Sequence, residues 1–177
     1  MIGHGRISKQ KLAKLMVLAL LTSSLMGIAS LTVTVYLGFA IDGRIGLGQH
    51  FLFALFATFV TILAQCMSMF YFIGTAKQAK DLLGSHPQAP EFIRRTREFK
   101  SRVFPPATMA ILFTMAAWII GGGVDTRVLP VWIHTILAVA ALSGNAYAFV
   151  REVQYMTKNN ILLDEVAVLI GDLPQTE

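Results

Sequence analysis

The sequence contains little charge and almost no cysteine. Asp, Glu, Lys and Arg make up 14% of the 177 residues and hydrophobic residues 55%, whereas charged residues reach about 25% in an ordinary soluble domain. The single cysteine, Cys66, excludes a structural disulfide within the chain. With a mean hydropathy of +0.62, this composition indicates a membrane protein.

The common catalytic signatures are also missing. There is no phosphate-binding Walker loop, no dinucleotide fingerprint, no His-Glu-x-x-His zinc helix and no Gly-x-Ser-x-Gly nucleophile motif. The net charge of +5 comes from residues that flank apolar runs, so anionic lipid headgroups are a simpler partner than nucleic acid. We therefore expect no independent catalytic activity and no nucleic-acid partner.

Four apolar runs are long enough to cross a bilayer, which requires about 20 helical residues. They cover residues 15–40, 51–76, 106–123 and 131–150, and none of them contains Asp, Glu, Lys or Arg. Ion pathways and proton relays usually place such residues inside the membrane. The sequence therefore gives little support to a transporter or channel.

The cationic residues predict the orientation, because cytoplasmic flanks carry an excess of lysine and arginine. Thirteen of the 15 precede the first span, connect spans two and three, or follow span four. The remaining two, Arg44 and Arg127, lie one in each of the other connections. Both termini are expected in the cytoplasm.

Short outer connections favour antiparallel neighbours. We predict an all-α membrane protein, a four-transmembrane-helix bundle of two similar antiparallel hairpins, forming one domain over residues 1–177. Including flanking residues, the spans are expected at about 13–40, 49–76, 106–123 and 130–154, with a cytoplasmic loop at 77–105 and a cytoplasmic tail at 155–177.

Within the loop, the charged stretch 91–102 predicts a short amphipathic helix on the cytoplasmic surface. Its aromatic residues Phe92 and Phe99, with Phe104 beyond, would face lipid or protein. The largely apolar tail at 160–170 is expected at the membrane interface or on a partner.

One stretch is nearly repeated. GFAIDGRIGLGQH, which ends at His50, resembles GGGVDTRVLPVWIH, which begins 83 residues later and ends at His134. Each copy has a glycine four residues before an aspartate, an arginine two residues after it, and then a histidine. Duplication or chance can produce so short a match. If the hairpins are duplicated, a pseudo-two-fold axis along the membrane normal relates them.

His50 and His134 are both expected near the outer edge of the membrane. At about 1.5 Å of rise per residue they differ little in depth. Each begins a helical face of small residues, spaced i+4, i+7, i+11 and i+14. These residues are Ala54, Ala57, Thr61 and Ala64 below His50, and Ala138, Ala141, Asn145 and Ala148 below His134.

Paired imidazoles, small faces and outer arginines together fit a b-type haem. His50 and His134 would ligate the haem iron, and Arg44 and Arg127 would bind its propionates. The neighbouring aspartates, Asp42 and Asp125, would hold those arginines or accept Nδ1–H from a ligating imidazole.

Other interpretations stay open. The histidines can be interfacial anchors, and the Asp-x-Arg pairs can be turn-shaping ion pairs. Zinc or copper is a third possibility, although no third ligand is evident nearby. Cys66, Met67 and Met69 are better explained by packing than by a copper site.

Two buried amides raise a similar choice. Gln65 and Asn145 would either hydrogen-bond across helices or serve a quinone headgroup. Hydrogen bonding between helices is the commoner role.

The leading function hypothesis is therefore a small haem b-binding subunit for electron transfer or anchoring in a larger respiratory-type complex. Its expected partners are the other membrane subunits of that complex and lipid. A bacterial cytoplasmic membrane is the expected location. The alternative is a cofactor-free structural or assembly subunit, whose small-residue and phenylalanine-rich faces bind neighbouring membrane proteins.

Overall fold

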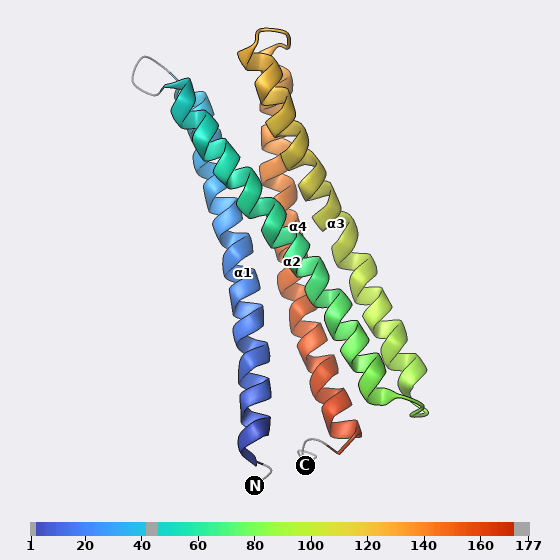
Figure 1. Cartoon of the computed structure of the whole chain (residues 1–177). Helices are drawn as coiled ribbons and strands as arrows, with labels where there is room; N and C mark the ends of the chain where they lie inside the picture. The colour runs from blue at the N-terminus through green and yellow to red at the C-terminus, as the bar shows by residue number, and fades with distance from the viewer. Residues whose placement is uncertain (1–2, 42–45, 172–177) are drawn as a thin grey trace.

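The computed structural model describes residues 3–41 and 46–171, with side chains from Lys14 onward. Its four helices are α1 (Gly3–Phe39), α2 (Leu47–Leu83), α3 (Ala89–Asp125) and α4 (Val131–Leu169). All four are long and apolar enough to cross a membrane. The predicted class, an all-α antiparallel four-helix bundle, is confirmed (Figure 1).

The bundle consists of two hairpins, α1 with α2 and α3 with α4 (Figure 1). Helix α2 also packs on α3, α1 packs on α4, and α2 contacts α4, whereas the described parts of α1 and α3 do not touch. This pattern is the one expected if a two-fold axis runs between α2 and α4. The two histidine-bearing helices are therefore parallel and central.

Helix α3 crosses the region where sequence analysis placed a separate surface helix. It is continuous from Ala89 and contains Pro105 and Pro106 in its interior. One buried face runs through the proline pair without a break, at spacings of three and four residues. Its members are Ala89, Phe92, Thr96, Phe99, Val103, Ala107, Ala110, Thr114 and Ala117. The phenylalanines thus pack inside the bundle rather than against lipid, and packing on this face outweighs the local cost of proline.

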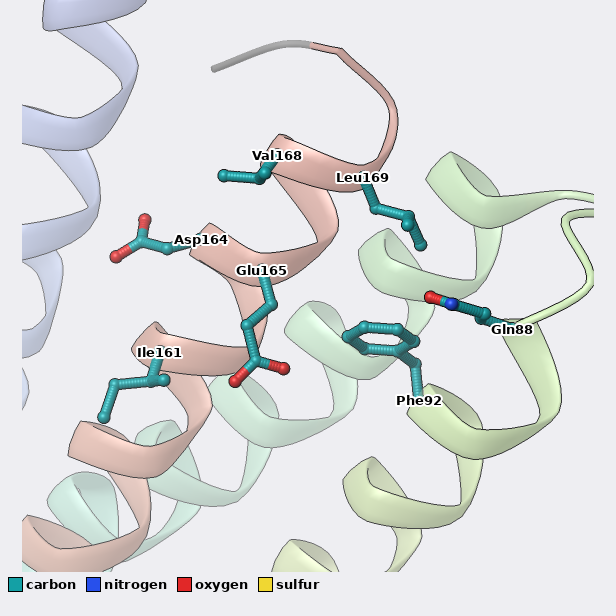
Figure 2. A pocket seen from close by; sticks show the side chains of 7 residues that line it. All are labelled: Gln88, Phe92, Ile161, Asp164, Glu165, Val168 and Leu169. Atoms are coloured by element: carbon teal, nitrogen blue, oxygen red, sulfur yellow. The ribbon is translucent and has the colours of Figure 1, made fainter. Parts of the chain in front are cut away.

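The tail also packs on its own chain. Residues 160–169 continue α4, and Leu162 and Val166 are fully buried. Figure 2 shows the last turns of α4 beside the first turns of α3, where a shallow pocket of about 520 Å³ is lined by Phe92 and Leu169. Glu165 beside it pairs with Arg95. One face of this segment is therefore covered by the chain itself.

Small residues set the closest helix crossings. A Cβ at Gly27 of α1 would lie 3.1 Å from Thr61 Oγ1 and 3.3 Å from Thr61 Cα of α2. The second hairpin has a looser counterpart, because a Cβ at Gly144 of α4 would lie 3.8 Å from Ala110 Cα of α3. Close backbone approach of this kind is how helices associate in lipid.

A leucine at Gly27 should therefore weaken the first hairpin. Gly27→Leu places a large side chain against the backbone of α2, so we expect about 1–3 kcal/mol of destabilisation. Gly74→Leu is the matched control, because a Cβ there meets nothing within 4 Å. Thermal unfolding in detergent measures both; equal midpoints for the two variants would contradict the crossing.

Candidate cofactor site

His50 and His134 meet between the two hairpins. They lie in the first turns of α2 and α4, both half-buried. Their ring centroids are 6.2 Å apart and the ring planes are nearly perpendicular, at 87°. The structure thus brings together the two histidines that the sequence places at similar depth.

Each imidazole packs on a glycine of the preceding helix. A Cβ at Gly38 of α1 would lie 3.0 Å from His50 Cε1, and a Cβ at Gly121 of α3 would lie 3.1 Å from His134 Cε1. Any larger residue would displace the ring. The glycine in each copy of the repeated stretch therefore has the same packing role against its histidine, although the two residues are 12 positions apart in the first copy and 13 in the second.

A backbone carbonyl orients the second imidazole. His134 Nδ1 lies 3.0 Å from the carbonyl oxygen of Ala117, one turn before Gly121. Because a carbonyl only accepts, a neutral His134 carries its proton on Nδ1 and donates it there. Nε2 is then left with a free lone pair. Asp125 does not take the orienting role that the sequence suggested for it.

The first imidazole has an equivalent neighbour. His50 lies beside the backbone carbonyl of Thr34, which is one turn before Gly38. The contact is looser than its counterpart, because His50 Nδ1 has no hydrogen bond of good geometry among the described residues. The two halves of the site are similar but not identical.

A cavity of about 530 Å³ surrounds the histidines and is lined by all four helices. Its volume lies in the usual range for small-molecule sites, about 300–1,000 Å³. Small residues of the two central helices, Ala54, Ala138 and Ala141, form part of the wall, and Thr114 lies on the lining from α3. The small faces predicted from the sequence thus leave space beside the rings at their outer ends and pack closely further in.

The outer turns place the predicted arginines and aspartates differently. Asp42 and Arg44 lie outside the described residues. Asp125 lines the cavity, whereas Arg127 is exposed in the turn above it and is not part of the lining.

The turn at Arg127 has an unusual backbone. Arg127 has a φ of 59°, and its N–H bonds to the Val124 carbonyl while Val128 N–H bonds to the Gly123 carbonyl. This pairing is a helix C-terminal motif in which glycine normally occupies the left-handed position. The arginine therefore sits where its side chain is conformationally costly.

Below the cavity, the buried amides hydrogen-bond between helices. Gln65 Nε2 donates to Asn145 Oδ1 at 3.2 Å, and Asn145 Nδ2 donates to Thr114 Oγ1 at 3.0 Å. All three side chains are almost fully buried. They link α2, α4 and α3, which is the interhelical role that the sequence favours for these amides. A role toward quinone stays a prediction.

Sequence reasoning missed Glu152. The apolar run of span four ended at residue 150, and the span expected at about 130–154 was treated as free of buried acidic residues, but Glu152 of α4 is 0% exposed. A signal was present: Glu152 lies 18 residues after His134, a spacing that continues the face of His134, Ala141, Asn145 and Ala148.

Comparisons with protein-family models, curated proteins and solved structures give no match.

The contact with Ala117 predicts the tautomer of His134. When the His134 imidazole is neutral, its ¹⁵N chemical shifts should report a protonated Nδ1 and an unprotonated Nε2. Gly121→Val should displace the ring and disturb this signature, because a Cβ at Gly121 already approaches His134 closely. Gly122→Val is the matched control, since a Cβ there meets nothing within 4 Å. A protonated Nε2 in the parent protein would contradict the geometry.

Proposed function

We propose that this integral membrane protein binds one haem b between its two hairpins, where His50 and His134 would hold the iron, and that it transfers electrons. The observation that carries the proposal is the convergence of two imidazoles, 6.2 Å between ring centroids, in a cavity lined by all four helices. A metal–nitrogen distance of about 2.0 Å on each side, plus about 1 Å from nitrogen to ring centre, gives roughly 6 Å. The observed separation fits one shared metal ion.

The number of ligands favours haem over a bare metal ion. The described residues contain no cluster of three or more His, Cys, Asp or Glu able to hold a metal. Structural zinc sites take four protein ligands and catalytic zinc sites three. Two histidines alone are too few for these sites, whereas haem supplies its own four equatorial nitrogens and needs only axial ligands.

The surroundings suit an apolar macrocycle. Gly38 and Gly121 hold the imidazole rings against α1 and α3, and the Ala117 carbonyl fixes the tautomer that leaves His134 Nε2 able to bind iron. Alanines on α2 and α4 line the cavity between the helices. The bound haem would supply a reversible one-electron change, while the chain holds the iron, orients its ligands and excludes water.

The haem propionates would lie at the outer rim. Arg127 is exposed in the outer turn, where a guanidinium can bind a carboxylate at the aqueous edge. Its strained left-handed backbone is consistent with an arginine retained for its side chain. Arg44, in the other outer turn, is proposed for the second propionate from the sequence alone.

The remaining parts of the proposal concern partners. The predicted outer connections are short, and in this proposal the electrons pass to or from another component. We propose a larger respiratory-type complex of the bacterial cytoplasmic membrane, with a quinone as one possible partner.

A second candidate function has its own observation. Phe53, Phe56, Phe59 and Phe70 are exposed along α2, on faces turned away from the bundle. Such a surface can bind a neighbouring membrane protein without any cofactor, which is the role of a structural or assembly subunit.

The two histidines provide the decisive test. His50→Ala and His134→Ala should each abolish the Soret band of protein purified from haem-supplied cells, because one imidazole is too little to hold a six-coordinate haem. His86→Ala, in the inner turn between α2 and α3, should keep it. A folded parent protein that stays colourless with added haem would support the cofactor-free role instead.

The Arg127→Gly variant distinguishes the effect of the arginine side chain from the effect of the left-handed backbone. Glycine suits the left-handed position, so thermal stability of the haem-free protein should hold or rise slightly. Haem affinity should fall by up to about fivefold, the value of an exposed ion pair of about 1 kcal/mol. Arg127→Lys, which keeps a positive charge, should lose less. An unchanged haem dissociation constant in the glycine variant would remove Arg127 from the site.

A further inference from the structure

The inner half of the bundle contains an acidic residue without a cation. Glu152 of α4 is 0% exposed. Ser24 Oγ of α1 donates a hydrogen bond to its Oε2 at 2.9 Å, while Oε1 has no partner among the described residues. A buried carboxylate is strongly unfavourable unless it is paired or protonated.

The groups around Glu152 provide no compensating charge. From α1 comes the Ser24 hydroxyl, and from α2 comes Ser68, the other polar side chain near the carboxyl. The adjacent Arg151 is turned toward Gln154 and Tyr155, with which its guanidinium makes hydrogen bonds and a stacking contact. The buried residues of α3 in this half are apolar apart from Thr96.

Titratable groups nearby are occupied elsewhere. The hydroxyl of Tyr71 on α2 donates to Asn160 Oδ1 and accepts from Asn159 Nδ2. The ion pairs of the described side chains, Arg94 with Glu91 and Arg95 with Glu165, lie near the inner end. Neither pair includes Glu152.

A protonated Glu152 can hydrogen-bond to both neighbouring hydroxyls without a cation. Ser68 Oγ is fully buried and, like Glu152 Oε1, has no hydrogen-bond partner of good geometry. A carboxylic acid gains an O–H donor, which Ser68 Oγ can accept, while Oε2 still accepts from Ser24. A metal cation is a poorer occupant, because one carboxylate and two hydroxyls fall short of the six to eight oxygens that calcium takes.

We propose that Glu152 is a proton-binding site inside the membrane domain, neutral at neutral pH, and connected to the histidine cavity by a column of buried polar side chains. The column consists of Ser68, Gln65, Asn145 and Thr114. Ser68 and Gln65 are three residues apart on one face of α2, and Gln65, Asn145 and Thr114 are linked by hydrogen bonds.

The column reaches the cavity at one end, because Thr114 lines the cavity. Other neighbours of the inner half are buried apolar residues, among them Leu20, Phe72 and Met156, and the Tyr71, Asn159 and Asn160 group, whose polar atoms bond to one another. Gln65 Oε1 is a further unpartnered buried atom along the column, and such atoms are typical positions for bound water. In this proposal the proton exchanges with the cavity along the column. This inference does not depend on whether haem is the ligand there.

Infrared spectroscopy tests the protonation state directly. The purified protein at neutral pH should show a carboxylic-acid C=O band that Glu152→Gln removes. Glu98→Gln, a change at an exposed glutamate of α3, should leave the band in place. Glutamine keeps an acceptor for Ser24 and a donor for Ser68, so the variant should fold.

Either of two results would overturn the proton site: no acid band at neutral pH in the parent protein, or a band that survives Glu152→Gln. If the Glu152→Gln variant fails to fold, the Ser68→Ala variant tests the same assignment. Removing the acceptor should move the acid band to higher frequency, and an unmoved band contradicts the assignment.

Deuterium exchange tests the path. Transfer into D₂O shifts the acid band as the proton is replaced, and Thr114→Val should slow this shift because it removes the hydroxyl where the column meets the cavity. Thr96→Val is the matched control, a buried threonine of the same helix that bonds its own backbone. Equal exchange in the parent protein and both variants would overturn the connection to the cavity.

Discussion

The close approach of α2 and α4 is the constraint on which the other features depend. Lipid provides no hydrophobic drive between helices, so association relies on packing of small side chains. Ala57 and Ala64 of α2 and Ala141 and Ala148 of α4 are all buried to 2% exposure or less. These alanines bring two parallel helices together at the centre of the bundle. The histidines that begin both faces then meet, although the described parts of α1 and α3 do not touch.

Much of this arrangement was predictable because it follows from helical periodicity. Apolar runs predict the spans, and the spacing below His50 and His134 predicts which faces turn inward. Glu152 was missed because a hydropathy window averages all faces of a helix. The apolar run that it detects ends at the first charged residues, even when one of them points into the bundle. The continuity of α3 was missed because Pro105 and Pro106 suggest a boundary, while the buried face that passes them becomes decisive only in the assembled bundle. The burial of the tail at 160–169 against α3 was missed for the same reason, because it too depends on packing between residues far apart in the sequence.

The similarity between the hairpins is strongest at the outer end. Gly38 with His50 and Gly121 with His134 make nearly the same contact, and a carbonyl one turn earlier faces each ring. Further in, the halves diverge, because Gln65 and Glu152 have no equivalent in the other hairpin. A common origin for the hairpins would account for the first observation, and later specialisation of the two halves would account for the second.

The length of the helices has a mechanical consequence. Each helix of 37 to 39 residues extends about 55 Å at 1.5 Å per residue, whereas the hydrocarbon layer measures about 30 Å. A surplus of roughly 25 Å of helix therefore extends beyond the hydrocarbon layer.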